Sequence, residues 1–557
     1  MRDNLRVVPL YFQQMKKFTS ILLLFIGCLN GLAQNYQINW QQCFGGSEQD
    51  QAYDIIEIPG GYFILGSTES ADGDISLNHG ISDGWLIKTD NSGNIIWEGT
   101  YGGSSGDNFV RIFPTENEDF YILGASRSSD GDISFDPYPD SWDHWILKID
   151  SEGDIIWDKI VGGSTGEVLW TGDITEDGGI LTVGWTNSND GDISVFYGGQ
   201  DTWITKISSE GELEWDFAIG TDWIDVGQAI IQTSDGGYLV GGSSMLGEGG
   251  NITCEPHSSL ADAILTKLDA DRNIEWQHCY GGSDHDGIVS LIEIEDGYVF
   301  GAYTSSNDGD VSGWHVGYNH LGNPEPDMWI VKIDFSGNII WQNALGGSDG
   351  EGGGRIFDNS DYGYIAFTTT YSNDGDVSGN HSMSEYYSDI WVVELDFDGE
   401  LITQQCFGGK GKEIIEHGVV IKDYNHFVIA GRTDYGPSYD VQCTPHGGNY
   451  DRDFWVFEVK DTLVGVQDNV TIDRNLKVYP NPAKDYVIFE IAGQINFSNF
   501  EVAKVSIFNS FGQEIKNPII YCTGDKLVWD IRAVNSGVYM YTVSSEGRIT
   551  SGKLLIR

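Results

Sequence analysis

Two aspartates separated by one glycine recur along this chain. Clustered carboxylate oxygens are the ligands that calcium prefers, and an Asp-Gly-Asp triplet resembles the start of a calcium-binding loop. Asp-Gly is also a common turn sequence, so a calcium site and a simple turn are both open interpretations. Calcium is the one cofactor that the sequence suggests. The aspartates are Asp72 and Asp74, Asp130 and Asp132, Asp190 and Asp192, Asp308 and Asp310, and Asp374 and Asp376.

A second set of acids stands five residues after the first glycine of a Gly-Gly or Gly-Thr step. If the chain closes into a ring, these carboxylates lie together near one mouth of a central channel, where they could bind a cation. The alternative is structural, because a carboxylate that accepts backbone N–H bonds can order the preceding loop. An acid present in every repeat favours the structural interpretation. The set is Asp50, Asp107, Glu167, Asp225, Asp286, Glu351 and Glu413.

Other catalytic chemistry has little support in the sequence. Five histidines follow the Asp-Gly-Asp positions, but they fall in different repeats, and we expect each to pack on a tryptophan. The chain contains no nucleophile elbow, zinc-binding HExxH, CxxC pair or P-loop. With 84 acids, 30 bases and a formal charge of −54, it lacks the basic surface that nucleic acids and anionic lipids require. The histidines are His79, His257, His315, His381 and His446.

A unit of about sixty residues positions these side chains. Each unit predicts four short antiparallel strands separated by glycine turns, which is typical of the blades of a β-propeller. The third strand begins with Asp-x-Trp, except that Ile264 replaces the tryptophan in the fourth copy. We expect an all-β fold with a seven-bladed propeller over residues 35–460. The seven copies start at Asp83, Asp143, Asp201, Asp262, Asp327, Asp389 and Asp453.

The two ends of the repeat array complement each other. Residues 35–46 form a last strand with no unit before it, and the seventh copy lacks that strand. The N-terminal strand should therefore complete the seventh blade. The combination of GGSxxD, D-x-W-[IL]-x-K-[IL]-D and W-x-x-x-x-GG resembles the seven-bladed propeller repeats of secreted bacterial proteins. The hairpin also resembles that of quinoprotein repeats, but the residues that would bind a quinone are missing.

Four cysteines test this closure. Cys43 and Cys279 occupy one strand end, and Cys443 and Cys254 occupy one loop, so closure places each pair in a single blade. We expect the disulfides Cys43–Cys443 and Cys254–Cys279, which suit an exported protein. Buried free thiols are the alternative.

The N-terminus has the pattern of an export signal over residues 1–34. Lys16 and Lys17 precede an apolar run at 18–29 and the small residues at 31–33, and Met15 is the better start. A lipoprotein signal ending at Cys28 is the alternative. No later segment is long and apolar enough to span a membrane, so we expect no transmembrane segment after signal removal.

After a polar linker at 461–475, residues 476–557 predict a small Ig-like β-sandwich. An ordered set of motifs in this segment resembles the type A C-terminal sorting domain of type IX secretion substrates from Bacteroidota; an ordinary adhesion module is the alternative. The resemblance implies that the type IX machinery is a partner and that the protein reaches the cell surface or the medium. The motif residues are Tyr479, Pro480, Asn481 and Pro482, then Gly537 and Tyr539, then Gly552 and Lys553.

The leading functional hypothesis is a non-catalytic binding or adhesion protein that engages surface glycans or proteins. This hypothesis is based on aromatic residues in the longest loops, since loops on rigid scaffolds commonly carry binding sites. The alternative is a hydrolase or lyase acting on polysaccharide at the channel mouth. Unlike polar residues in the channel would favour that alternative. The candidate ligand contacts are Trp314, Tyr318, Tyr386 and Tyr387.

Overall fold

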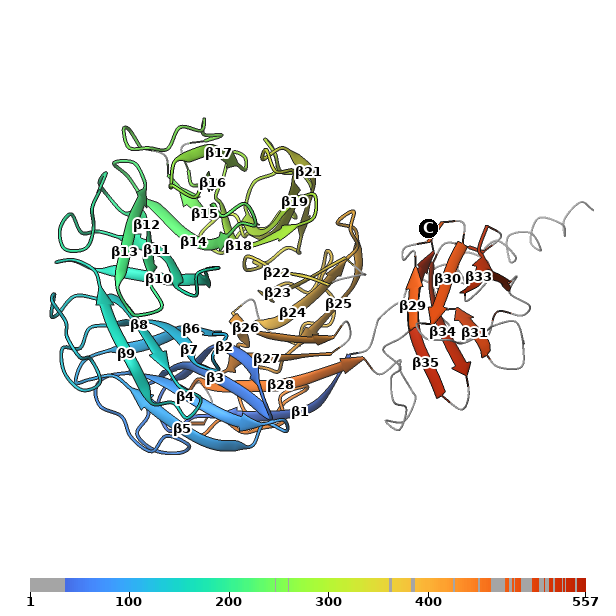
Figure 1. Ribbon diagram of the computed structural model, residues 1–557, viewed down its shortest axis with the longest axis horizontal. Coiled ribbons are helices and arrows are strands. Elements are labelled where there is room, and N and C mark those ends of the chain that lie inside the picture. Colours follow the sequence, from blue (N-terminus) through green and yellow to red (C-terminus); the bar gives the residue numbers. More distant parts are fainter. Residues whose placement is uncertain are drawn as a thin grey trace, which may run out of the picture. The chain divides into compact units, whose positions relative to one another are not determined.

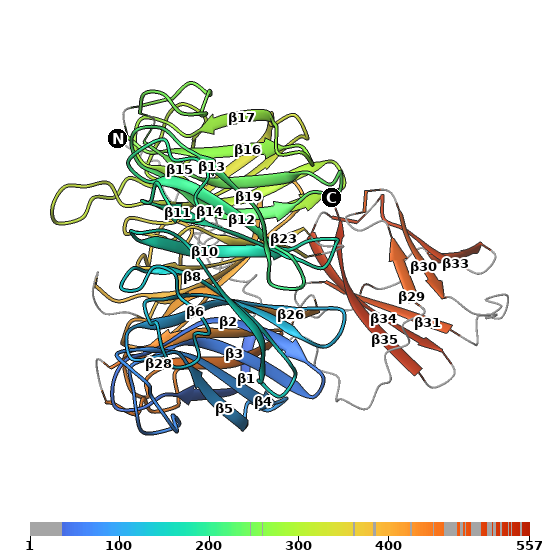
Figure 2. The ribbon, with the colours of Figure 1, turned by 60° about the vertical axis from the view of Figure 1, so that its left-hand side comes forward.

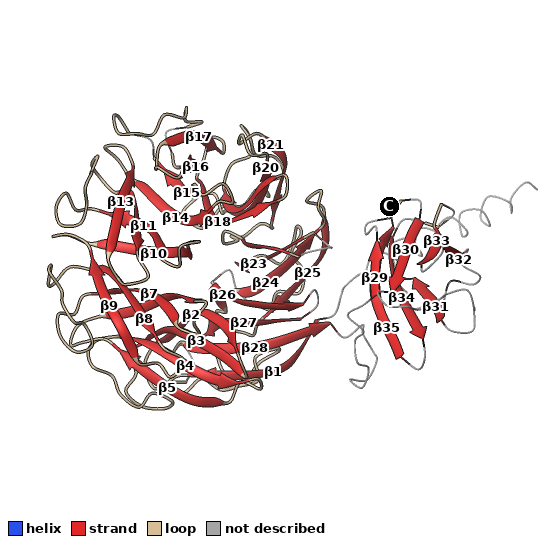
Figure 3. Ribbon diagram, viewed as in Figure 1, coloured by secondary structure: helices blue, strands red, loops and turns tan. Residues whose placement is uncertain are grey.

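The computed structural model describes residues 36–461 except 246, 259, 360–362, 382–385, 424–425 and 449–450. Beyond these it describes 476–479, 483–484, 486–491, 503–509, 515, 520–523, 526–532, 534–535, 537–545 and 548–556. The proposed signal peptide and most of the linker lie outside the described residues. Strands and loops make up the described residues (Figure 3), and no helix long and apolar enough to cross a membrane occurs among them. The chain divides into Tyr36–Asp461 and a second unit that includes Thr462–Arg557.

The first unit is a seven-bladed β-propeller of four-stranded antiparallel sheets (Figure 1). The first strand of each blade lies nearest the ring centre and the fourth lies outermost (Figure 1). Blades one to three are β2 (Asp50–Ile58), β3 (Gly61–Thr68), β4 (Asp83–Asp90) and β5 (Ile95–Tyr101); β6 (Asp107–Pro114), β7 (Phe120–Ser126), β8 (Asp143–Ile149) and β9 (Ile155–Val161); and β10 (Glu167–Ile174), β11 (Ile180–Thr186), β12 (Asp201–Ile207) and β13 (Leu213–Ile219). Blades four to six are β14 (Asp225–Gln232), β15 (Tyr238–Ser244), β16 (Asp262–Leu268) and β17 (Ile274–Tyr280); β18 (Asp286–Ile294), β19 (Gly297–Thr304), β20 (Asp327–Ile333) and β21 (Ile339–Leu345); and β22 (Arg355–Asp358), β23 (Tyr364–Thr370), β24 (Asp389–Leu395) and β25 (Leu401–Phe407).

The seventh blade joins the two ends of the array. It consists of β26 (Ile414–Asp423), β27 (His426–Thr433), β28 (Asp453–Asp461) and, as its outermost strand, β1 (Tyr36–Phe44). The pairing of β1 with β28 runs from Tyr36 opposite Asp461 to Phe44 opposite Phe454. The predicted closure is therefore confirmed.

Both expected disulfides are present. Cys43 and Cys443 join β1 to the loop before β28 across a sequence separation of 400. Cys254 and Cys279 join a loop and a strand of blade four across a separation of 25. Cys406 is buried as a free thiol.

Apolar side chains fill the spaces between the blades. The tryptophans of the Asp-x-Trp strands are fully buried, and Trp85 of blade one packs on Phe454 of blade seven with ring centroids 4.7 Å apart. Ile264, which replaces tryptophan in blade four, is also buried. Because each sheet covers its neighbour, the inner strands form a rigid wall around the channel.

The second unit contains two small sheets with one core. One sheet has the order β29 (Leu476–Tyr479), β30 (Tyr486–Ile491), β33 (Lys526–Asp530) and β32 (Ile520–Thr523). The other has the order β31 (Ala503–Asn509), β34 (Gly537–Ser545) and β35 (Arg548–Ile556). Phe489 of the first sheet packs on Tyr541 of the second with centroids 5.1 Å apart, and both sheets contribute buried residues to one cluster, as a β-sandwich requires.

Candidate functional site

The seven equivalent acids stand where the innermost strand of each blade begins. Asp286 is fully buried, and its Oδ2 accepts hydrogen bonds from the Gly282 N–H and the Ser306 hydroxyl, both at 2.9 Å, while Thr304 donates to Oδ1. Each of the other acids likewise accepts a backbone N–H from the loop four residues earlier and a hydroxyl from the next strand. We call this set the constant ring: Asp50, Asp107, Glu167, Asp225, Asp286, Glu351 and Glu413. This geometry corresponds to the structural interpretation.

A second buried carboxyl faces each member of the constant ring. The first aspartate of every Asp-x-Trp strand has one side-chain oxygen, Oδ1, that is buried without a hydrogen-bond partner. At Gly346, a Cβ atom would lie 2.6 Å from Asp327 Oδ1 and 2.2 Å from Glu351 Oε2, so both carboxyls converge on this glycine. Burial raises the pKa of Glu351 to about 8, and it raises the pKa of Asp143, in another pair, to about 9. We call each such pair of carboxyls a junction. A proton shared by the two carboxyls would give the buried Oδ1 atom a hydrogen-bond partner.

The Asp-Gly-Asp carboxylates bind the Gly-Gly loop that precedes them. Asp308 Oδ1 accepts the Ser283 N–H at 2.7 Å, and Asp132 Oδ2 accepts the Gly102 N–H at 3.1 Å. Similar bonds to this loop are made by Asp72, Asp74, Asp130, Asp190, Asp192, Asp374 and Asp376, and Asp310 contacts His257. Only the loop starting at Asp374 has a glutamate at the twelfth position, Glu385, which lies outside the described residues. Calcium binding stays a prediction, since no group of three metal-ligating side chains is assembled in the described parts of the chain.

The recurring loop histidines contact carboxylates instead of the expected tryptophans. His315 Nδ1 lies 2.9 Å from Asp327 Oδ2 in its own blade, and Nε2 lies 3.7 Å from Asp376 of the next. His79, His257, His381 and His446 contact equivalent aspartates. His257, His315, His381 and His446 also lie 3.3 to 3.7 Å from an aspartate of the next blade, so these four side chains connect neighbouring blades.

The channel itself is lined by a different set of residues. Four positions after each member of the constant ring stand residues of six different types. In five blades a β-bulge precedes this position and redirects its side chain. We call this set the channel ring: Asp54, Arg111, Thr171, Ala229, Ser290, Arg355 and His417.

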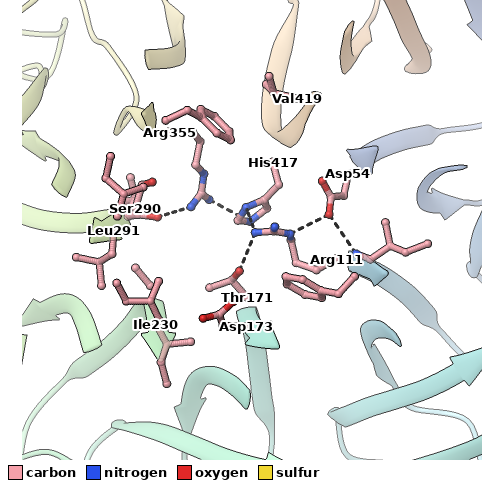
Figure 4. A pocket seen from close by; sticks show the side chains of 18 of the residues that line it. Asp54, Arg111, Thr171, Asp173, Ile230, Ser290, Leu291, Arg355, His417 and Val419 are labelled. Carbon is pink, nitrogen blue, oxygen red and sulfur yellow. Dashed lines mark hydrogen bonds and ion pairs between the residues drawn. The ribbon is translucent and has the colours of Figure 1, made fainter. Parts of the chain in front are cut away.

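The channel ring surrounds a cavity of about 330 Å³, in which two guanidinium groups meet one imidazole (Figure 4). Arg111 Nε donates to Asp54 Oδ2 at 2.9 Å, and its Nη1 donates to Thr171 Oγ1 at 2.9 Å. Arg111 Nη1 also lies 3.1 Å from His417 Nδ1, and Arg355 Nη2 lies 3.1 Å from His417 Nε2. Five ring residues therefore form one connected network: Asp54, Arg111, Thr171, Arg355 and His417.

Burial and charge set the protonation states in the cavity. Burial, with the two guanidinium groups beside it, holds the pKa of His417 well below its usual value, so the imidazole is neutral. Burial and the neighbouring Arg111 lower the pKa of Arg355 to about 10, which leaves it cationic at neutral pH. Burial also raises the pKa of Asp173, another lining residue, to about 6.

The sequence interpretation missed the channel ring because its members do not repeat. A signal was available, however. Aligning the seven repeats on the constant ring and reading four residues further gives one channel residue per blade.

The aromatic candidates lie on the face formed by the loops between second and third strands and by the Gly-Gly loops. We call it the loop face. Tyr318 and Tyr386 are 61% and 60% exposed, and Tyr387 is half-buried. Trp314 packs edge-on against Tyr318 at 6.1 Å and donates its indole N–H to the Glu325 carbonyl. The loop between β19 and β20 that carries Trp314 and Tyr318 extends away from the strands (Figure 2).

Blades five and six bring their aromatic loops together. The ring of His320, from blade five, lies 6.5 Å from the ring of Tyr386, from blade six. Further exposed apolar side chains occur in loops of the same face: Leu77, Ile81, Phe135, Val195, Trp223, Ile224, Val316, Leu321 and Tyr439.

The C-terminal motif residues occupy strand ends and one sheet. Tyr479 ends β29, Gly537 and Tyr539 lie in β34, and Gly552 and Lys553 lie in β35. The Tyr539 hydroxyl donates to the Asn535 carbonyl at 2.9 Å. Pro480, Asn481 and Pro482 lie outside the described residues.

Comparison with protein families decides the identity of this unit. Residues 477–557 match the family model described as a secretion system C-terminal sorting domain. The C-terminal unit is a type IX sorting domain. The protein is therefore a secreted seven-bladed propeller that carries this sorting domain, and the domain directs it to the cell surface or the extracellular medium.

Solved structures of low similarity accompany this match. Sqt1 from Chaetomium thermophilum is 11% identical, with a TM-score of 0.37, over 77% of this chain and 100% of that chain. Drosophila Plexin A in complex with Semaphorin 1b is 7% identical, with a TM-score of 0.37, over 77% of this chain and 88% of that chain. A putative glycoside hydrolase from Parabacteroides distasonis is 9% identical, with a TM-score of 0.29, over 75% and 88%. At these values none supports an argument about function, and no curated protein matches the chain.

Proposed function

We propose that this protein is a non-catalytic binding protein, displayed on the cell surface, whose loop face contacts a glycan or a surface protein. The observation that carries the proposal is the exposure of Tyr318 and Tyr386 beside further exposed apolar side chains. Apolar side chains gathered on one face of a soluble protein mark interaction sites. Aromatic rings are suited to such contacts because they offer a large flat surface with little conformational entropy to lose.

The scaffold supports this role. Trp314 anchors its loop through the Glu325 carbonyl, so Tyr318 is presented on an ordered segment. The formal charge of −54 disfavours polyanionic ligands and favours neutral or basic ones.

The test is a double substitution, Tyr318→Ala with Tyr386→Ala, assayed on a glycan array and on intact cells. We expect at least a tenfold loss of binding with an unchanged melting temperature, since both side chains are largely exposed. The matched control is Ile340→Ala, which removes a 52% exposed side chain from β21 of blade five, away from the loop face. Wild-type binding by the double variant would refute the proposal.

A second function, polysaccharide hydrolysis or lysis in the channel, is favoured by the unlike residues of the channel ring. Against it, Asp54 is already held by Arg111 and the Ile112 N–H, whereas glycoside hydrolysis needs two available carboxyl groups. Reducing-sugar release that is lost in His417→Ala would favour this function over binding. Wild-type protein that releases no sugar from a panel of neutral and acidic polysaccharides would exclude it.

A further inference from the structure

Arg355, which is half-buried in the channel wall, is an exception among the cations that this acidic chain withdraws from solvent. Lys206 and Lys267 are each only 3% exposed at the side chain, and each pairs with two carboxylates. Arg355 donates instead to the backbone carbonyls of Glu416 and Val289 and contacts the neutral ring of His417. Among the described residues, no carboxylate lies within ion-pair distance of it. A buried cation is normally matched by an anion, because desolvation of an unpaired charge is costly.

The cavity also contains more hydrogen-bond donors than acceptors. A neutral imidazole has one acceptor nitrogen, yet guanidinium nitrogens of Arg111 and Arg355 approach both nitrogens of His417 at 3.1 Å. Only one of these contacts can be a hydrogen bond to the ring. The second guanidinium N–H is thus available to an acceptor that enters the cavity.

The apolar residues of the cavity wall indicate the chemical character of the rest of the ligand. Ile230, Leu291, Phe357 and Val419 line the cavity together with the polar residues (Figure 4). A volume of about 330 Å³ suits a small molecule. The apolar walls favour an organic body over a bare inorganic ion.

We propose that the central channel binds a small organic acid, with its carboxylate held by Arg355 and Arg111 and its apolar body against the aliphatic wall. Arginine presents its N–H groups in a planar fork that matches the two oxygens of a carboxylate. His417 stays neutral and orients Arg355 without adding repulsion between cations. This site is distinct from the loop face, and its binding requires none of the loop aromatics.

The experiment is calorimetric titration of the full secreted chain with benzoate, with benzamide as the neutral analogue. Phosphate and sulfate test whether an inorganic oxyanion is the better ligand. We expect one benzoate per chain, at least tenfold weaker binding of benzamide, and weaker binding of both inorganic ions. Absence of benzoate binding, equal binding of benzamide, or preference for phosphate or sulfate would overturn the proposal.

Substitution locates the site. Arg355→Met should weaken benzoate binding at least tenfold. Arg127→Met should leave it unchanged, because this control removes the same charge from an exposed position on the loop face. Equal effects of the two variants would refute the channel site.

Arg355→Met removes bonds to two backbone carbonyls and could fail to fold, so a second measurement uses the wild-type chain. In a crystal with 4-bromobenzoate, anomalous scattering from bromine should place the ligand in the channel with its carboxylate on Arg355. Bromine located elsewhere, or no bromine signal, would refute the assignment.

Discussion

The constant ring and the channel ring lie four residues apart along the chain in every blade, yet their residue compositions follow opposite rules. Every member of the constant ring is an acid, because each must accept the N–H and hydroxyl groups of a loop that recurs in every blade. The channel ring has six residue types at seven positions, because its side chains face a cavity and no recurring backbone group has to be satisfied. Repetition therefore identifies the scaffold, and departure from repetition identifies where a ligand can be bound.

The two disulfides occur in only two of the seven blades, so they depart from the repeat and yet stabilise the scaffold. Their removal should give the largest loss of stability among these predictions. Replacing Cys43 and Cys443 by serine should lower the free energy of unfolding by about 6 kcal/mol in the loop-entropy model, because the bridge spans 400 residues. Replacing Cys254 and Cys279 should cost about 3 kcal/mol, because that loop spans 25 residues. Urea unfolding of both variants measures the difference. Equal losses would show that loop length does not govern these bridges.

The raised pKa values of Glu351 and Glu413 in the constant ring predict that stability falls as pH rises. Burial raises the pKa of Glu413 to about 8, above its value in the unfolded chain. The folded state thus holds this proton more tightly, so its stabilisation is complete below about pH 4.5 and is lost as pH rises through about 8. Between pH 5 and pH 9 the propeller should lose roughly 4 kcal/mol of stability from Glu413 alone. Thermal melts across this range measure it, and a flat profile would contradict the shared proton.

Asp389→Asn sharpens this test at one junction. Its amide would place a permanent N–H donor where Asp389 Oδ1 now faces Glu413, and its oxygen would still accept from the His381 N–H. We expect the variant to be less stable than wild type at pH 5, where protonated His381 loses its ion pair with Asp389, and more stable by roughly 2 kcal/mol at pH 9. Asp271→Asn, on an exposed turn, is the control and should change stability at neither pH. Destabilisation of Asp389→Asn at both pH values would count against the interpretation.

A paired substitution on β18 compares the two rings directly within one strand. Asp286→Ala leaves two hydroxyls and one N–H without an acceptor and should cost about 3 kcal/mol. Ser290→Ala, four residues along, removes only the acceptor of the Ile356 N–H and should cost about 1 kcal/mol. Urea unfolding of the two variants provides the comparison, and equal costs would erase the distinction between the rings.

Most of the fold could be predicted from the sequence because each blade repeats the same pattern of residues. The Asp-x-Trp strands, the closing strand and both disulfides follow from placing equivalent residues at equivalent positions. The channel ring could not be predicted in that way, since its residue types do not recur from blade to blade: His417 occurs once, and arginine stands at this position only as Arg111 and Arg355. The glycines at 352–354 also interrupt the alternating pattern just before Arg355, so its inward orientation is clear only from the structure.

Because β1 pairs with β28, the ring can close only when the whole propeller has been synthesised. β1 is synthesised first, but its partner strand and the thiol of Cys443 follow some 400 residues later. A chain that ends early is left with an open sheet edge and a reactive Cys43, features that promote aggregation and attract proteases. Only a full-length propeller can pair this sheet edge and oxidise this thiol. Formation of the closing blade therefore distinguishes complete chains from truncated ones before the protein reaches the cell surface.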